Sequence, residues 1–316
     1  MRITELFHFC TAKLNNYLNY SITDLPNQVI QVPKFMEISD SSPENHRNWS
    51  EIPCDVILMI LMKLGTVEIL ESVQFVCKMW YNLCKEPSIW HTIHINGLDE
   101  PIPELKLEKM LVNAVDRSAG GLIDLNIEGF GSDELCSYFA SRSTQLKRLR
   151  LVCCDYISDK VIIGALESLT SLEELELTLC DFQDEAAIPI INSCPSLTTF
   201  KFNPHGSKFH YNACDNEALA IAGNMPELRH LQLFRNGLTN DGLRAILDGC
   251  PHLQSLDLRA CFHIELVGNL EKRLLEQIKD FRRPYDSTDD CNYITIYDSI
   301  TDTDDYEVYD HPLGSD

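Results

Sequence analysis

The pattern Leu-x-x-Leu-x-Leu, with Ile or Phe as occasional replacements, constrains the fold of this chain more than any other feature. Its six copies begin at Leu122, Leu146, Leu172, Leu197, Leu228 and Leu253, and successive starts lie 24, 26, 25, 31 and 25 residues apart. Four of these five spacings fall within the roughly 20–29 residues of a leucine-rich repeat. One such unit cannot bury its leucines alone, whereas stacked units share a continuous core. The sequence therefore predicts an α/β arc over residues 96–283, with parallel strands inside and helices outside.

Each repeat is predicted to be a short strand followed by a returning helix. The helices are expected to begin at Asp159, Asp184, Asp215 and Asn240, because Asp and Asn favour helix starts and apolar residues follow at helical spacing. Three copies carry a cysteine at the ninth position, where the side chain is expected to turn inward and cap the strand end: Cys154, Cys180 and Cys261. A weak strand at 92–95 and a helix at 105–115 predict an atypical capping unit.

A compact helical block is predicted for residues 48–95, directly before the repeats. Pro53 suits a helix start, where a missing N–H costs nothing. The apolar residues Val56, Ile57, Ile60, Leu61 and Leu64 then form a wide stripe, and Gly65 ends the helix. Two further helices are expected over 67–73 and 76–83. About 45 residues make a poor domain on their own, so the excess apolar surface indicates a face for a partner.

The block resembles the F-box. The opening Ile52-Pro53, the Leu64-Gly65 helix end, the core Val76-Cys77-Lys78-x-Trp80 and the terminal Pro87-Ser88-x-Trp90 all stand where that motif expects them, although Ile52 replaces the commoner leucine. With a leucine-rich array following at once, the chain resembles plant-type F-box/LRR-repeat proteins over about 48–283. The expected fold is therefore a small three-helix F-box followed by a short leucine-rich-repeat arc.

The resemblance implies that the F-box binds a Skp-type adaptor, and through it the cullin and RING subunits of an SCF-type ubiquitin ligase. The arc then holds a protein substrate, and the chain is a non-catalytic subunit that raises the effective concentration of target lysines. The residues expected at the adaptor contact are Ile52, Pro53, Val56, Ile57, Ile60, Leu61, Val76 and Trp80. The alternative for each is that it only holds the three helices together.

Polar residues between the strand leucines are expected to line the concave surface. Parallel neighbours predict ion pairs between Arg148 and Glu174 and along Arg150, Glu176 and Lys201. These are either self-neutralising surface pairs worth about 0–1 kcal/mol each or part of a substrate surface. After the strands, Phe234, Arg235 and Arg259 predict an exposed aromatic ring beside two arginines, the composition of an interface hot spot. The candidate substrate residues are Arg150, Glu176, Lys201, Phe234, Arg235 and Arg259.

Charge and composition exclude several other classes. Lys and Arg number 26 against 48 Asp and Glu, a formal net charge of −22, which disfavours nucleic acid and anionic membranes as partners. No apolar run reaches the roughly 18 residues of a membrane helix, and the first residues lack a signal-peptide pattern. The 13 cysteines then predict reduced thiols in the nucleus or cytoplasm. No nucleotide-binding loop, zinc-protease motif or nucleophile elbow occurs, so neither catalysis nor a cofactor is expected.

Three segments are expected to lie outside the repeats. Residues 1–47 predict a flexible leader, within which Met36 is an alternative start. Residues 284–316 hold ten acidic side chains and no Lys or Arg, which predicts a disordered acidic tail. The 31-residue spacing marks an insertion with His205, His210 and Cys214. These three residues lack zinc-site spacing and favour a longer loop over a metal site.

Two functions besides a ligase subunit remain open. The arc also suits a non-degradative protein-binding scaffold or a competitive inhibitor, which would not lead to ubiquitin transfer. A small-molecule co-receptor is the third possibility, and it is less favoured because six or seven repeats form a short arc that encloses a ligand poorly.

Overall fold

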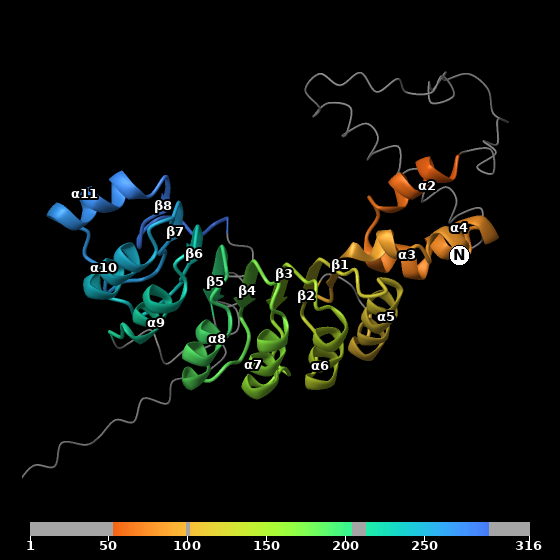
Figure 1. Ribbon diagram of the computed structural model, residues 1–316, viewed down its shortest axis with the longest axis horizontal. Coiled ribbons are helices and arrows are strands. Elements are labelled where there is room, and N and C mark those ends of the chain that lie inside the picture. Colours follow the sequence, from red (N-terminus) through yellow and green to blue (C-terminus); the bar gives the residue numbers. More distant parts are fainter. Residues whose placement is uncertain (1–52, 99–101, 204–212, 291–316) are drawn as a thin grey trace, which may run out of the picture.

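The computed structural model describes residues 53–98, 102–203 and 213–290. Within them, eight strands form one parallel sheet in sequential order from β1 to β8 (Figure 1). The strands are β1 (Thr92–Asn96), β2 (Asp124–Glu128), β3 (Arg148–Val152), β4 (Glu174–Thr178), β5 (Thr199–Asn203), β6 (His230–Gln232), β7 (Ser255–Asp257) and β8 (Asp280–Arg282). All six strands predicted from the leucine pattern are present, and the weak strand before them is β1. The expected α/β repeat arc is confirmed.

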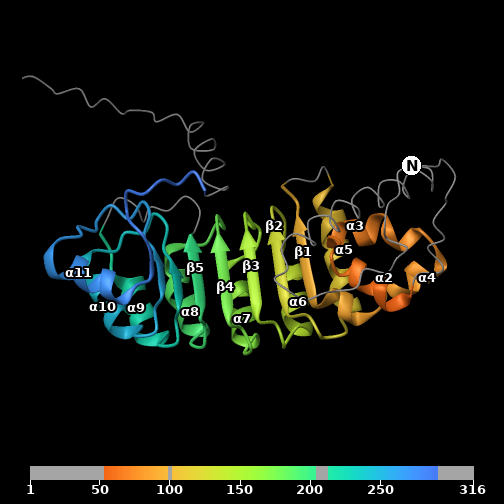
Figure 2. The same cartoon turned by 90° about the horizontal axis from the view of Figure 1, so that it is seen from above.

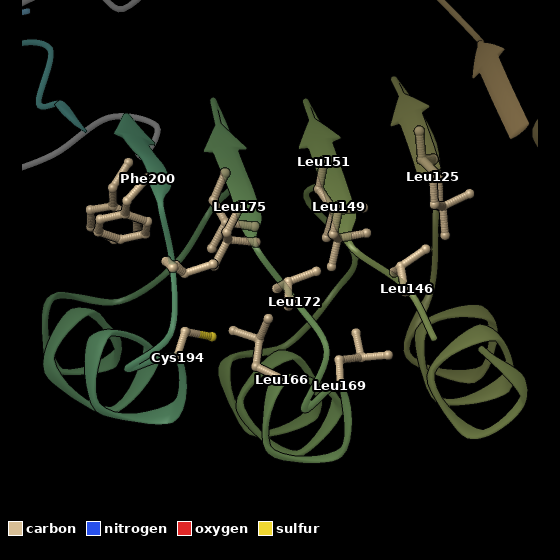
Figure 3. Packing of buried hydrophobic residues seen from close by; sticks show 14 of the residues in the cluster. Leu125, Leu146, Leu149, Leu151, Leu166, Leu169, Leu172, Leu175, Cys194 and Phe200 are labelled. Atoms are coloured by element: carbon tan, nitrogen blue, oxygen red, sulfur yellow. The ribbon is translucent and has the colours of Figure 1, made fainter. Parts of the chain in front are cut away.

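The repeat leucines stay in register from strand to strand. Leu125 pairs with Leu149, Leu149 with Leu175, and Leu175 with Phe200. Figure 3 shows these side chains between the strands and the helices, where they are buried. Because every repeat delivers its apolar residues to the same depth, the core continues along the whole arc.

The helices cover the outer side of the arc (Figure 1). They are α5 (Glu104–Arg117), α6 (Asp133–Arg142), α7 (Asp159–Ser168), α8 (Ala187–Ser193) after the 3₁₀ turn η5 (Asp184–Ala186), α9 (Asn216–Asn224), α10 (Asn240–Gly249) and α11 (Gly268–Gln277). A proline directly follows the C-cap residue of α8, α9 and α10; these C-cap residues are Cys194, Met225 and Cys250. Proline disfavours helical backbone in the residue before it, so each helix ends there.

Two of the acidic residues expected at the helix starts also join consecutive repeats. The Asp159 carboxylate accepts from the Gln183 amide (3.3 Å), and the Asp215 carboxylate accepts from the Thr239 amide (2.7 Å). The N-caps of α7 and α10 are Ser158 and Thr239, one residue before the predicted Asp159 and Asn240, whereas Asp215 is the N-cap of α9 as predicted. The cap prediction was wrong for Asp159 because a carboxylate at the first turn also reaches the loop of the next repeat, one period away.

The ninth-position cysteines lie as predicted. Cys154, Cys180 and Cys261 are fully buried, and their thiols approach carbonyl oxygens of the preceding strand and its end, at 3.6 Å from Ile127 O, 3.6 Å from Leu151 O and 2.8 Å from Leu233 O respectively. Burial raises the pKa of Cys261 to about 12. A thiol that holds its proton this firmly is a poor nucleophile, which agrees with a structural role.

The helical block before the arc consists of α2 (Cys54–Leu61), α3 (Thr66–Glu71), the 3₁₀ turn η3 (Val73–Phe75), α4 (Lys78–Leu83) and the 3₁₀ turn η4 (Pro87–His91). The three predicted helices are present, although the second ends before Val73, where the short turn begins. Figure 2 shows this block at the β1 end of the sheet, with α10 and α11 at the opposite end. The buried core is continuous from Ile57 to Ile278, so the block and the arc share one interior.

The last repeat extends further than the leucine pattern predicted. Strand β8 carries Phe281 rather than leucine and pairs in parallel with β7. Residues 284–290, here called the C-terminal strap, were expected to belong to a disordered tail. They instead contact the arc, beginning with the Pro284 carbonyl, which accepts from the Ala260 amide (2.8 Å). The leader, Met36, the rest of the tail, His205 and His210 lie outside the described residues, and Cys214 is exposed.

Candidate functional site: the two ends of the arc and its concave face

Arg117, at the end of α5, connects the first repeat to the helical block. Its guanidinium donates to the Gln74 side-chain oxygen (2.9 Å) and to the Cys84 carbonyl (3.2 Å), and it lies 5.3 Å from the Trp90 ring. The Trp90 indole N–H donates to the same Cys84 carbonyl (2.9 Å). Burial lowers the pKa of Arg117, but a guanidinium remains charged at neutral pH. One planar cation therefore contacts three separate parts of the block.

Two further contacts join the block to the arc. The His94 amide of β1 donates to the Thr66 hydroxyl of α3 (3.2 Å), and Lys106 of α5 forms an ion pair with Glu71. Helix α3 packs against β1 and α5, the η4 turn packs against α5, and α2 packs against α4. The block thus uses one side for the arc and leaves parts of α2 and η3 facing solvent.

The predicted adaptor residues divide into buried and accessible groups. Ile57, Ile60, Leu61 and Trp80 lie in the core of the block, and Trp80 is only 2% exposed. Pro53 is exposed, while Val56 and Val76 are partly buried and pack against the core. Ile52 lies outside the described residues. In this conformation the buried four hold the helices together, so the accessible ones carry the prediction of an adaptor contact.

Sequence reasoning did not single out the most exposed apolar residues of the block. Met59 is 66% exposed, Phe75 is 62% exposed, and Met62 and Tyr81 are also exposed. Met59 and Met62 lie on the side of α2 that its buried residues leave free. Their three-residue separation, which places two residues on one helix face, was the signal that could have identified them.

Charged side chains on the concave face form an ordered row across the central strands. Arg150 binds Glu128 on one side and Glu176 on the other (3.0 Å), and Lys201 binds the second oxygen of Glu176 (3.0 Å). The predicted row Arg150–Glu176–Lys201 is present and gains Glu128, which is buried. Because each charge in this row has an opposite neighbour, its electrostatic field is largely cancelled.

A second set of pairs differs from the prediction. Arg148 binds Asp124 of the preceding strand (2.8 Å) rather than Glu174, and His94 lies 3.4 Å from the same carboxylate. Burial raises the pKa of Asp124, but hydrogen bonds from His94 and Arg148 outweigh it and hold that pKa below its usual value. Both strand neighbours of Arg148 carry a carboxylate, so the register alone could not predict which of them Arg148 binds. Side-chain geometry decides this.

The predicted hot spot is only partly exposed. Phe234 and Arg235 are partly buried, with the guanidinium 5.8 Å from the ring centre. Arg259 is only 4% exposed, so the expectation of two accessible arginines was wrong for this residue. The Arg235 amide donates to the Arg259 carbonyl (3.1 Å), which places the two residues side by side on adjacent repeats.

Arg259 is buried because it has partners on both sides of its guanidinium. Nε and one terminal nitrogen donate to the Asp257 carboxylate (2.7–3.1 Å), while the other terminal nitrogen donates to the Ser287 carbonyl (3.0 Å) and to Asp290. Asp290 also lies 3.5 Å from Arg282. The hydrogen bond from Arg259 lowers the pKa of Asp290 below its usual value.

Comparison with known proteins agrees with both halves of this architecture. The F-box-like family matches residues 49–96, and the leucine-rich-repeat family matches residues 168–190 and 225–247. The F-box protein SKIP19 of Arabidopsis thaliana is 43% identical over 284 residues, which cover 90% of this chain and 89% of the relative. The chain belongs to the F-box/LRR-repeat family.

Two other Arabidopsis thaliana proteins support this assignment. The putative F-box/LRR-repeat protein 22 is 45% identical over 86% of this chain and 89% of its own length. The putative F-box/LRR-repeat protein 23 is 48% identical over 81% of this chain, which spans 57% of that relative. The helical block is therefore an F-box, and the predicted resemblance to plant F-box/LRR-repeat proteins is confirmed.

Among the described residues, none of the helices has the length and apolar character needed to cross a bilayer. Nor does any group of three or more His, Cys, Asp or Glu in that part of the chain stand close enough to hold a metal ion.

Proposed function

We propose that this chain is the substrate-recognition subunit of an SCF-type ubiquitin ligase. In this proposal the F-box binds a Skp-type adaptor, which links it to cullin and RING subunits, and the arc binds a target protein. The observation that carries it is a pair of exposed methionines, Met59 on α2 and Met62 at its C-cap, in an F-box whose other side is joined to the arc. Methionine side chains are flexible and apolar, and these properties suit a surface that binds a partner protein.

The junction supports this role physically. A ligase subunit without catalytic groups acts by holding target lysines near the activated ubiquitin, which requires a defined distance between its two binding ends. A shared core and the contacts of Arg117 hold the F-box and the arc in one orientation. The position of a substrate bound on the arc would therefore be transmitted to the adaptor end.

Co-purification of the full chain with a Skp-type adaptor and a cullin tests the proposal. We expect a stoichiometric complex for the native chain and at least a 100-fold weaker one for the double variant Met59→Glu, Met62→Glu, because two carboxylates would be desolvated in the interface. The matched control is Leu219→Glu, which replaces an equally exposed apolar residue on α9 of the arc.

Both variants must retain the native unfolding midpoint for the comparison to hold. If the native chain forms no adaptor complex, the ligase proposal fails and a non-degradative scaffold becomes the better interpretation. If the Met59/Met62 variant binds as well as the native chain, the contact must lie elsewhere on the F-box, at Pro53, Val56, Val76 or Phe75.

A further inference from the structure

We propose that Arg259 and Arg282 form a recognition site for an anionic side chain of the substrate, and that Asp290 of the C-terminal strap occupies this site until a substrate displaces it. This inference rests on the proposed role of the arc as a substrate receptor. It assigns both a ligand chemistry and a regulatory segment to the C-terminal end of the arc.

The guanidinium of Arg259 is divided between two carboxylates of different kinds. Asp257, two residues earlier on β7, accepts three hydrogen bonds from it and also accepts from the Arg259 backbone amide (3.1 Å). The ion pair between Asp257 and Arg259 therefore forms within a single repeat. The remaining terminal nitrogen points to the strap, where it meets Asp290 and the Ser287 carbonyl.

The charge balance shows which carboxylate is replaceable. Asp257 already neutralises Arg259 from inside the repeat, with 13% of its side chain exposed. Asp290 adds a second negative charge that Arg282 balances from the neighbouring strand. Without Asp290, the two arginines and one aspartate leave a net positive site at the surface. Such a site favours a carboxylate or a phosphate, which accept two hydrogen bonds from arginine in a fixed geometry.

The strap has the features of a segment that can leave. Asp290 is half exposed, and Tyr285 is 78% exposed although its ring lies 5.4 Å from that of Phe262. The strap begins at a firm point, the Ala260-to-Pro284 hydrogen bond, and ends at the Asp290 ion pairs. Phe262 itself belongs to the repeat and stays exposed beside the site.

The strap therefore indicates what a substrate segment would look like. It presents an aromatic ring to Phe262 and, five residues later, a carboxylate to Arg259 and Arg282. A protein segment with an aromatic residue followed at about this distance by Asp, Glu or a phosphorylated residue would make both contacts. The tethered strap competes with it at a high effective concentration.

Fluorescence anisotropy of a labelled peptide tests this site in the full chain. The probe has the sequence of residues 284–290, Pro-Tyr-Asp-Ser-Thr-Asp-Asp. We expect the Asp290→Asn chain to bind it at least tenfold more tightly than the native chain, because the internal competitor has lost its charge. The matched control, Asp289→Asn, removes the neighbouring exposed charge and should bind like the native chain.

Two further experiments identify the preferred anion and the arginine that binds it. A peptide with phosphoserine in place of its last Asp should also bind the Asp290→Asn chain, and the tighter of the two peptides identifies the preferred anion. Adding Arg282→Gln to the Asp290→Asn chain should abolish the gain in affinity for both peptides. Arg282 is chosen because it is exposed, whereas replacing buried Arg259 would disturb the fold.

Equal binding by the Asp290→Asn and Asp289→Asn chains would overturn the inference, as would a gain that survives Arg282→Gln. Adaptor co-purification of the same variants separates this result from the proposed function. A chain that binds the adaptor but shows no gain in peptide affinity refutes the anion site alone, and a chain that binds no adaptor refutes the ligase role alone.

Discussion

The two ends of the arc are closed by different physical means. At the β1 end, the F-box shares an apolar core with the first repeat, and residues such as Trp90, Ile93 and Leu111 are completely or almost completely buried. At the β8 end, the seven-residue strap is held mainly by polar contacts: the Pro284 carbonyl accepts from Ala260, the Ser287 carbonyl accepts from Arg259, and Asp290 pairs with two arginines, while the Tyr285 ring lies beside Phe262. Terminal repeats need such closure because their outer faces lack a neighbour.

The difference indicates which end is permanent and which can open. Apolar burial responds little to salt or pH, whereas ion pairs at the surface are screened and titrate. The F-box end is therefore suited to a fixed mechanical connection, and the strap end to exchange with a competing ligand. The predictions that follow test this contrast, in order of decreasing effect.

The largest effect is expected for Trp90→Ala at the F-box end. Truncating a fully buried tryptophan costs about 3–5 kcal/mol, and the shared core predicts that the F-box and the first repeats lose stability together. Urea unfolding followed by circular dichroism measures this change. The control Tyr156→Ala, at an exposed site, should cost less than about 0.5 kcal/mol. Separate transitions for the F-box and the arc would contradict a shared core.

The next largest loss of stability is expected for Asp257→Asn, in the repeat that the strap contacts. Removing the internal partner of a buried arginine costs about 3 kcal/mol, because the charge of Arg259 is left poorly compensated. The same urea measurement applies. Asp241→Asn, whose pair with Arg244 is exposed, should change stability by less than about 0.5 kcal/mol. A small effect at Asp257 would mean that the strap, rather than the repeat, neutralises Arg259.

Arg117→Ala should have a moderate effect at the junction. The variant loses hydrogen bonds to Gln74 and Cys84 and the contact with the Trp90 ring, for an expected cost of about 1–3 kcal/mol. Arg117→Lys should recover little, since an ammonium cannot reproduce the planar fork. Thermal unfolding measures both. Full recovery by lysine would show that only the charge matters there.

Lys201→Ala on the concave face should change stability by only about 0–1 kcal/mol, because its side chain is partly exposed and Glu176 keeps Arg150 as a partner. The change should shrink further in 1 M salt, where such pairs are screened. Unfolding curves at low and high salt measure this. A large, salt-independent loss would indicate that the row stabilises the arc beyond pairwise attraction.

The smallest expected change is a pH-dependent release of the strap. Arg259 lowers the pKa of Asp290, so the ion pairs are intact above the ordinary aspartate pKa of about 3.9 and are lost as pH falls through the lowered value. A pH titration of the Arg259 guanidinium signal by NMR follows this step. Asp290→Asn should abolish this step, and a titration that persists in that variant would contradict the prediction.

Much of the arc could be predicted from residues alone. The leucine pattern located six strands, because units that repeat with a short, fixed period bury their apolar residues by stacking on one another. The cysteine positions and the proline helix ends followed from the same period. Strand β8 was missed because Phe281 is its only large apolar residue and the repeat pattern had already ended.

The candidate sites were harder to predict because they depend on contacts between residues far apart in the chain. The burial of Arg259 requires Asp290, 31 residues later, and composition had suggested an unstructured tail there. The separation of buried Ile57 and Trp80 from exposed Met59 required knowing how α2 packs against α4 inside the F-box. Adaptor binding itself remains a prediction.

The sequence by itself determined the family, the number of central repeats and the residues that fill their core, because periodic apolar burial is a local property repeated many times. Only the tertiary structure decided how the ends are closed: by a shared apolar core with Arg117 at one end, and by a strap whose Asp290 reaches Arg259 and Arg282 at the other. The physical reason is that each closure joins groups which no period relates, so their meeting depends on the path of the folded chain.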